Sequence, residues 1–201
     1  MNPLESALKE YFGSVKLAKI QKTRVGIAGL GGLGSNCALH LVRSGFKRLV
    51  LCDFDVVEAK NLNRQFYFSD QLKLPKTDAL KANLLRINPD LSLILSREKL
   101  TGKNTEKIFQ DCDAVVEAFD KALYKQMIAR AYSRSGKFFV SASGLAGWGK
   151  ADEIKTRKIH GSFYLIGDLV SEATKKNPPC SQRVSIAAAK QADCILSWVL
   201  G

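Results

Sequence analysis

The sequence of 201 residues lacks three features that each define a class of protein. It has no apolar run near the ~20 residues that a transmembrane helix needs. It has no N-terminal basic segment followed by an apolar core, which a secretory signal requires. Its five cysteines include no Cys-x-x-Cys pair, which argues against both a zinc ribbon and a disulfide framework. We therefore expect a cytoplasmic protein with no membrane segment, no zinc and reduced thiols.

Acidic residues are also few, because 19 acidic side chains face 31 basic ones and leave a net charge of +12. Such a charge attracts anions, which include nucleotides, acidic proteins and nucleic acids. The lysines are spread along the chain, and no aromatic residues are interleaved with them in an RNA-binding motif. We interpret most of them as solvated surface residues and do not expect nucleic acid as the main partner.

Short apolar runs alternate with helical patterns over most of the chain. We predict strands at residues 24–28, 48–52, 91–95, 114–117 and 138–141, and helices at residues 35–44, 76–87, 104–109, 121–135 and 184–200. Strands separated by helices pair in parallel through right-handed crossovers. The fold class is therefore α/β, with a Rossmann-like, mostly parallel sheet and flanking helices. We expect a single nucleotide-binding domain over residues 1–201, with residues 1–22 as an N-terminal helical arm.

The pattern changes after Gly144. Ile154, Ile159 and residues 163–166 indicate a few short antiparallel strands near the C-terminal end. Residues 171–183 contain Pro178 and paired lysines, so we predict a flexible loop there. The helix predicted after this loop is apolar on most of its surface, which indicates that it is buried.

A glycine-rich turn follows the first predicted strand. Gly29, Gly31 and Gly34 fit the pattern G-x-G-x-x-G between a strand and a helix. The free N–H groups of such a helix N-terminus bind anions. Asp53 ends the second strand, 19 residues beyond Gly34, where a carboxylate can accept hydrogen bonds from ribose hydroxyls. These residues alone are compatible with NAD, FAD or ATP, and also with a tight turn that binds no ligand.

Residues 53–65 are too polar for a core element, yet they begin at the edge of the sheet where ligands bind. Arg64 carries a planar, permanently charged group that suits phosphate oxygens, and Lys76 begins the next helix. Two cations suit a triphosphate better than a dinucleotide. From the residues alone, Arg64 could instead pair with Glu58 or Asp70, and Lys76 could be an ordinary solvated lysine.

Together these motifs resemble the ThiF/MoeB family, which is related to the adenylation domains of ubiquitin-activating enzymes. The resemblance is carried by Gly-Leu-Gly-Gly-Leu-Gly, by Asp-Phe-Asp-x-Val-Glu-x-x-Asn-Leu-Asn-Arg-Gln, and by Pro-Lys-Thr before a helix that ends in Ile-Asn-Pro. It runs from about Lys22 to about Asp120, with a weaker similarity over residues 183–192. In its short length and its segment Val-Glu-Ala-Phe-Asp, the chain resembles the ThiF branch associated with thiamine biosynthesis.

The resemblance implies a role for each matched residue. It implies that Arg64, Lys76 and Asp120 are catalytic and that Asp120 binds Mg²⁺. The ATP-binding residues that it implies are Gly29, Gly31, Gly32, Gly34, Asp53, Asp55, Asn61, Asn63, Arg64, Gln65 and Lys76. From the residues alone, Asp120 would instead cap the helix predicted at residues 121–135.

The resemblance also implies the reaction. The protein would use ATP and Mg²⁺ to adenylylate the C-terminal Gly-Gly carboxylate of a small ubiquitin-like sulfur-carrier protein of the ThiS kind. It would act as a homodimer, although residues 1–22 contain no counterpart of the arginine that many relatives send into the neighbouring subunit. Some relatives use a loop cysteine to receive the carrier, so Cys180 is a candidate sulfur-transfer thiol.

Three alternatives stay open. A tRNA threonylcarbamoyladenosine dehydratase-like enzyme would adenylylate a small carboxylate on RNA, which the net charge favours. An NAD-dependent oxidoreductase would leave Arg64, Lys76 and Asp120 unexplained. A non-catalytic nucleotide-binding scaffold, or half of a heterodimer, would bind ATP without adenylylating a carrier.

Overall fold

The computed structural model describes residues 2–201, and Met1 of the predicted N-terminal arm lies outside them. Seven strands form one sheet in the order β3-β2-β1-β4-β5-β7-β6. The strands are β1 Arg24–Ala28, β2 Arg48–Cys52, β3 Ser92–Ser96, β4 Ala114–Glu117, β5 Phe138–Ala142, β6 Lys155–His160 and β7 Phe163–Gly167. Neighbouring strands pair in parallel, except that β6 is antiparallel to β7. The predicted α/β Rossmann-like fold with antiparallel pairing near the C-terminal end is confirmed.

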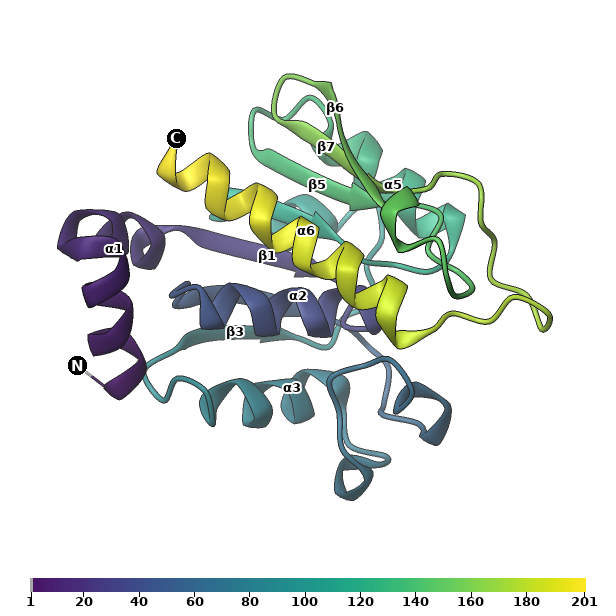
Figure 1. Cartoon of the computed structure of the whole chain (residues 1–201), viewed down its shortest axis with the longest axis horizontal. Coiled ribbons are helices and arrows are strands. Elements are labelled where there is room, and N and C mark those ends of the chain that lie inside the picture. The colour runs from purple at the N-terminus through teal and green to yellow at the C-terminus, as the bar shows by residue number, and fades with distance from the viewer. Residues whose placement is uncertain (1) are drawn as a thin grey trace.

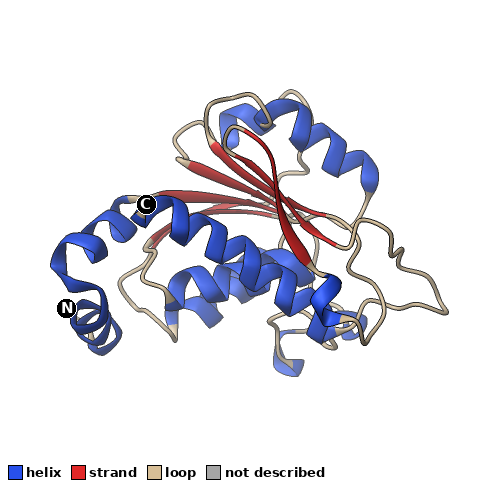
Figure 2. Ribbon diagram, turned by 45° about the horizontal axis from the view of Figure 1, so that its top comes forward, coloured by secondary structure: helices blue, strands red, loops and turns tan. Residues whose placement is uncertain are grey.

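Helices cover both faces of the sheet (Figures 1 and 2). α2, α3 and α6 lie on one face, and α4 and α5 lie on the other. The helices are α1 Pro3–Lys22, α2 Gly32–Arg43, α3 Lys76–Leu85, α4 Thr105–Ile108, α5 Ala122–Tyr132 and α6 Ser181–Leu200, with short 3₁₀ turns η1 Ala59–Asn61, η2 Ser69–Gln71 and η3 Ala151–Glu153. Among residues 2–201, the helices all fall short of the length and apolarity that a membrane crossing requires.

The central strands are apolar on both sides because each face is covered. Ile27 and Val116 pack into the cluster beneath α2, α3 and α6. Ala28 and Val115 pack into the cluster on the α5 side. Gly26 also faces that side, and a Cβ atom there would lie 2.4 Å from Cδ1 of Phe109. The sheet centre is therefore a tightly packed platform for the loops that leave its carboxyl edge.

Several predicted boundaries were wrong by a few residues. α2 begins at Gly32, three residues before the predicted helix, because the glycine turn opens directly into it. α6 begins at Ser181, so the last part of the predicted loop 171–183 is helical. β3 lies one residue later than predicted, at Ser92–Ser96. Each error lies at an end of an element, where local sequence signals are weakest.

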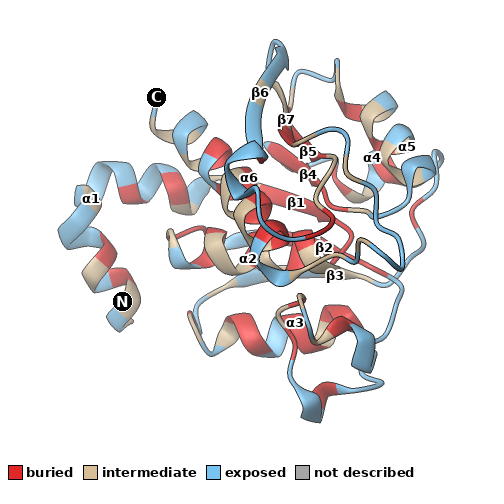
Figure 3. Cartoon of the chain, turned by 45° about the vertical axis from the view of Figure 1, so that its right-hand side comes forward, coloured by how far each residue is buried: buried red, intermediate tan, exposed pale blue. Residues whose placement is uncertain are grey.

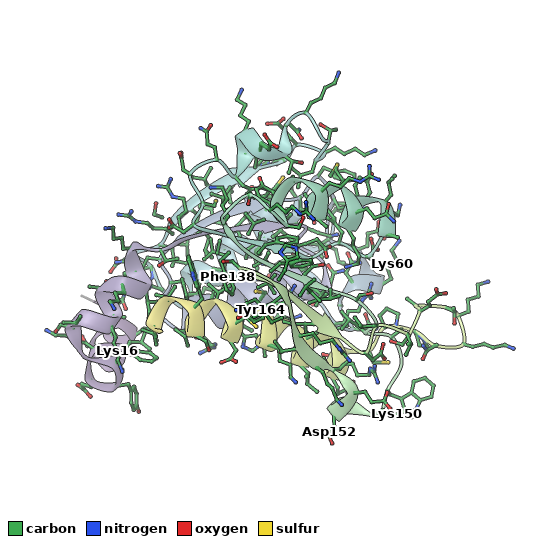
Figure 4. All side chains as sticks on the ribbon, turned by 90° about the horizontal axis from the view of Figure 1, so that it is seen from above. Lys16, Lys60, Phe138, Lys150, Asp152 and Tyr164 are labelled. Carbon is green, nitrogen blue, oxygen red and sulfur yellow. The ribbon has the colours of Figure 1, made fainter. Side chains whose placement is uncertain are left out.

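α1 lies at one end of the molecule, far from the loops at the carboxyl edge. Figure 4 shows Lys16 of α1 at one end and Lys60 and Lys150 at the other. The helix is kinked at Gly13, where φ is 74°. Its first turns are held by buried Glu5, whose carboxylate lies 2.7 Å from Nζ of Lys47. This ion pair fixes α1 without contacting the opposite edge.

Candidate functional site

The carboxyl ends of β1, β2 and β4 meet at the centre of one sheet edge. β1 pairs with both β2 and β4, so Ala28 lies between Cys52 and Glu117. The strands are buried, whereas the loops that follow them are partly exposed (Figure 3). Strand order reverses between β1 and β4, and ligands of open α/β sheets bind outside such a reversal. This edge is therefore the candidate site.

The glycine turn connects β1 to α2, and two of its glycines are required for steric reasons. Gly29 has φ of 92°, a value that side chains with a Cβ rarely adopt. A Cβ atom on Gly34 would lie 1.9 Å from the carbonyl oxygen of Gly29. Gly31 is the N-cap residue of α2, and no side chain caps it. The start of this helix therefore has no side-chain cap, and its first N–H groups can bind an anion.

Asp53 joins the glycine turn to the end of β2. Its Oδ2 accepts a hydrogen bond from the backbone N–H of Leu30 at 2.6 Å, and its Oδ1 accepts one from Asp55 at 2.8 Å. Burial raises the pKa of Asp53 above its ordinary value, and the nearby charge of Lys76 offsets part of that rise. The residue is 9% exposed, and each of its carboxylate oxygens accepts one backbone hydrogen bond.

Lys76 is buried at the first position of α3, so the interpretation of a solvated lysine was wrong. Its Nζ lies 3.0 Å from Oδ2 of Asp55. The hydroxyl of Tyr67 donates to the carbonyl of Leu30 at 2.8 Å and contacts that of Lys76 at 3.4 Å. The start of α3 is therefore tied to the glycine turn, which brings the cation near the N-terminus of α2.

The stem of Arg64 lies over the start of α2. Its Cγ would be 3.5 Å from a Cβ atom on Gly32, and its backbone oxygen accepts from Nδ2 of Asn36 at 2.8 Å. Its guanidinium donates to the carbonyl of Lys60 at 3.0 Å and to Asn63 at 2.8 Å. The recorded ion pair of Glu58 is with Lys60. Thus Arg64 lies beside the helix N-terminus, and within residues 2–201 its guanidinium bonds are to two neutral oxygens.

The other polar residues of this segment have distinct positions. Asn61 is buried, and its Oδ1 accepts from the N–H of Glu58 at 2.9 Å, so it closes the 3₁₀ turn η1. Gln65 is buried beside Gly31, and in the part of the chain that the structure describes its Oε1 has no hydrogen-bond partner. Asn63 donates to the carbonyl of Pro179 at 3.3 Å. Asn61 shapes the loop, Gln65 offers a free acceptor, and Asn63 joins the loop to the segment before α6.

Asp120 is exposed in the loop after β4. The N-cap residue of α5 is Lys121, and no side chain caps that helix, so the capping role considered for Asp120 was wrong. The preceding Phe119 contacts the glycine turn, because its Cδ1 would be 3.1 Å from a Cβ atom on Gly29. Among the described residues, no three His, Cys, Asp or Glu side chains are grouped as metal ligands. Asp120 is thus the exposed residue that directly follows Phe119, which contacts the glycine turn.

Sequence reasoning missed two features beside this loop. One is a buried cluster of Glu117, Lys125 and Ser141, in which the fully buried carboxylate of Glu117 accepts from both other side chains. The sequence signal was an acidic residue that ends an otherwise apolar strand. The other is an open cavity of about 650 Å³ along α5. Its lining includes Lys99, Leu100, Leu123, Tyr124, Met127 and Arg130.

Cys180 lies at the N-cap position of α6 and is partly exposed. The other four cysteines are buried, and burial raises the pKa of Cys52 and of Cys112 to about 12. Cys180 follows Pro179, whose carbonyl binds Asn63. The structure therefore places this thiol next in the chain to the residue that binds Asn63, and its Sγ lies 3.5 Å from the carbonyl oxygen of Pro178.

Comparison with known proteins adds family evidence to this geometry. The profile of the ThiF family matches residues 5–192. Escherichia coli K12 sulfur carrier protein ThiS adenylyltransferase is 33% identical over 128 residues, which are 63% of this chain and 51% of that protein. Eremothecium gossypii adenylyltransferase and sulfurtransferase UBA4 is 34% identical over 63% of this chain and 29% of its own length. The matches span about half or less of these relatives.

Solved structures share the fold. Escherichia coli tRNA N6-threonylcarbamoyladenosine dehydratase, TcdA, in complex with ATP has a TM-score of 0.88 and is 17% identical. The match covers 97% of this chain and 93% of that one. Escherichia coli MccB has a TM-score of 0.74 at 19% identity, over 99% of this chain and 64% of that one. At these identities the likeness concerns the fold alone.

Proposed function

Because the chain belongs to the ThiF family, we propose that it is an ATP-dependent adenylyltransferase for the C-terminal Gly-Gly carboxylate of a small ubiquitin-like sulfur-carrier protein. The similarity to ThiS adenylyltransferase supports a ThiS-like carrier and a role in thiamine thiazole biosynthesis. One observation supports the proposal: the stem of Arg64 lies beside the uncapped start of α2, and Tyr67 ties the backbone of the buried Lys76 to that of Leu30 in the glycine turn.

In this proposal the nucleotide lies across the carboxyl edge of the sheet. Its phosphates bind the N–H groups of the glycine turn and α2, as anions do at helix N-termini. Asp53 accepts from the ribose hydroxyls. The adenine occupies the apolar cavity along α5, whose Tyr124 packs on Phe119 with ring centroids 5.2 Å apart. Phe119 in turn contacts Gly29, so the base cavity adjoins the phosphate turn.

The chemistry requires positioning and charge stabilisation. A carboxylate oxygen of the carrier forms a bond to the α-phosphorus, while the bond from that phosphorus to the bridging oxygen breaks. Pyrophosphate leaves with the electron pair, and the product is a carrier acyl-adenylate. No proton has to be removed, since a terminal carboxyl group with a pKa of about 3.5 is ionised at neutral pH. The reaction therefore needs oriented reactants and cations rather than a nucleophilic side chain.

Three residues would supply this stabilisation. Arg64 and Lys76 would exchange their present partners, the Lys60 carbonyl and the Asp55 carboxylate, for phosphate oxygens. Mg²⁺ commonly binds nucleotides with only one or two protein carboxylates, the phosphates supplying further ligands. The single carboxylate of Asp120 fits that donor set. The metal would reduce the negative charge on the phosphates.

The experiment is to incubate the protein with ATP, Mg²⁺ and a panel of carriers that end in Gly-Gly. Mass spectrometry should detect the adenylylated carrier, and ATP–pyrophosphate exchange should depend on the carrier. Arg64→Ala and Asp120→Ala should each lower exchange about a hundredfold, since one such donor contributes about 3 kcal/mol to the transition state.

Arg48→Ala is the matched control, because Arg48 is exposed and is the first residue of β2, at the opposite end of the strand from the candidate site. It should leave exchange unchanged. Near-normal exchange in both the Arg64 and Asp120 variants would reject these assignments, and no adenylylation of any carrier would reject the proposed reaction.

A second candidate is the adenylylation of a carboxylate on tRNA, and the net charge of +12 favours it. The same assay distinguishes the two. Adenylylation that requires threonylcarbamoyl-modified tRNA, and that is absent with every carrier protein, would support this alternative.

A further inference from the structure

Glu117 is the last residue of β4 and is fully buried in the described structure. Its Oε1 accepts from the backbone N–H of Phe119 at 2.7 Å, and its Oε2 accepts from the hydroxyl of Ser141 at 2.5 Å. Nζ of Lys125 lies 3.2 Å from both oxygens and donates to the carbonyl of Ala142 at 2.7 Å. One carboxylate thus binds the loop after β4, the first turns of α5 and the end of β5.

Burying this ion pair contributes little net free energy to the stability of the sheet. Removing two charges from water costs several kcal/mol per ion, and apolar residues of similar volume stabilise a core as well or better. The other residues of β4 are apolar and buried. The charge at position 117 therefore indicates a requirement for geometry at the point where the strand ends, rather than for stability alone.

The loop that Glu117 holds carries two groups that border the site. Phe119 contacts the glycine turn and packs on Tyr124 of the cavity, and the next residue is Asp120. The loop has a further anchor on its other face, because Nε2 of Gln191 in α6 donates to the backbone oxygen of Glu117 at 3.0 Å. The hydrogen bond from the Phe119 N–H to Glu117 thus holds the backbone immediately before Asp120.

We propose that Glu117 is a positioning residue for the nucleotide site, with Lys125 as its charge partner. It fixes residues 118–120 so that Phe119 supports the glycine turn and Asp120 faces the phosphates. This role rests on the proposed function, because it assigns Glu117 to the same site. Glu117 itself, fully buried, does not touch the substrate.

The test compares Glu117→Gln with the wild-type chain. An amide has the same shape, but it is neutral and its nitrogen cannot accept a hydrogen bond. Either the Phe119 bond is lost or the Ser141 hydroxyl must turn to accept, and Lys125 is left without its counter-ion in both cases. Hydrogen exchange measured by mass spectrometry should show faster exchange in the peptide that covers residues 118–121. Titration with a non-hydrolysable ATP analogue should show about tenfold more Mg²⁺ required for half-saturation.

Glu5→Gln is the matched control, since Glu5 is also buried and paired with a lysine, but at the opposite end of the molecule. It should lower the melting temperature without changing either readout. If Glu117→Gln does not fold, Ser141→Ala serves instead, because it removes one bond and keeps the ion pair. It should shift the same readouts in the same direction by a smaller factor.

An unchanged rate of hydrogen exchange at residues 118–121 of Glu117→Gln would overturn the proposal. Faster hydrogen exchange with unaltered binding of nucleotide and Mg²⁺ would overturn it as well. If Asp120→Asn alone left the Mg²⁺ requirement unchanged, the metal assignment of the proposed function would fail. In that case, the affinity of Glu117→Gln for the analogue without Mg²⁺ would test the role through Phe119. A weaker affinity than that of the wild type would support it, and an equal affinity would overturn it. If the wild-type chain bound no nucleotide, the proposed function would fail together with this role, whereas the exchange measurement would still report whether Glu117 holds the loop.

Discussion

At the scale of single residues, Asp53 combines burial with a proposed role in ribose binding that requires its charge. Burial disfavours the ionised form and raises its pKa above 3.8, although Lys76 and two backbone N–H donors oppose the shift. A raised pKa in the folded state means that protonation favours folding. The contribution of Asp53 to stability is therefore largest below its unfolded pKa and is lost as pH rises through the folded value.

The same shift predicts the pH dependence of nucleotide binding. Affinity for ATP should fall on acidification at a pH above the ordinary carboxyl value, because protonated Asp53 is a poorer acceptor for ribose hydroxyls. Calorimetric titrations at several pH values would measure this. Asp53→Asn should remove this step while leaving the titration of the phosphates themselves. An identical pH profile in the variant would exclude Asp53 as the titrating group.

Gly34→Ala tests the glycine turn directly. The added Cβ would lie 1.9 Å from the Gly29 carbonyl oxygen, so the backbone must move. We expect a loss of 1–3 kcal/mol in unfolding free energy, about the cost of overpacking, and at least a tenfold weaker affinity for ATP. Gly136→Ala is the control, because Gly136 lies in the loop before β5, at the opposite end of the strands, and no atom lies within 4 Å of a Cβ there. Its φ of 82° means that this substitution should also lower stability, but it should leave the affinity for ATP unchanged. Equal affinities in both variants would contradict the phosphate role of the turn.

The residues that the sequence identified are those with strong local signals. The glycine turn, Asp53 and Lys76 follow strands or begin helices, and the structure brings them to one edge. The Glu117–Ser141 bond joins residues 24 positions apart, and no local pattern specifies it. Likewise, the burial of Lys76 depends on its packing with Asp55 and Tyr67.

At the scale of elements, the order of strands and helices followed from alternating apolar patterns. The predicted antiparallel pairing is that of β6 with β7. What the sequence did not specify is that β7 pairs in parallel with β5 and so extends the main sheet, while β6 is the edge strand. Apolar patterns this short do not specify which strand is the neighbour. The start of α6 was also missed, since Ser181 and Gln182 resemble loop residues and are helical through the context of Arg183.

Arg183 joins α6 to the loops beyond β5 and β7. Its guanidinium pairs with buried Asp168 and donates to the carbonyls of Gly149 and Lys150 at 3.2 Å. Arg183→Met leaves the carboxylate without its counter-ion, and we expect a loss of about 3 kcal/mol. Urea unfolding would measure it. Arg157→Met is the control. It removes one hydrogen bond from the edge strand β6 to the Gly167 carbonyl and should lower the unfolding free energy by about 1 kcal/mol.

Asp168 also predicts a pH dependence of stability. Burial of Asp168 acts to raise its pKa. Hydrogen bonds from the backbone N–H groups of Ser171 and Val170, together with the charge of Arg183, act more strongly in the other direction, so the pKa lies below 3.8. A depressed pKa contributes stability that is present above the unfolded value and lost as pH falls through the folded value. Unfolding free energy should therefore decline below about pH 4, and the decline should be shallower in Asp168→Asn. An equal slope in both proteins would show that other carboxylates account for acid unfolding.

At the scale of the whole molecule, the charge of +12 predicts how a partner arrives. An acidic carrier should associate quickly at low ionic strength, and its association rate should fall about tenfold between 50 and 300 mM salt, because the screening length shortens. Stopped-flow measurements would test this. A salt-independent rate would indicate that the basic surface does not guide the carrier.

The position of α6 has a consequence for how the chain folds. α6 follows all seven strands in the sequence, yet it packs against α2, which follows the first strand. During synthesis, the apolar side of α2 therefore stays uncovered until the last helix has left the ribosome. Pairing across so many intervening residues gives a high contact order and slow closure. Chaperone dependence in the cell should thus concentrate on nascent chains that still lack residues 181–200.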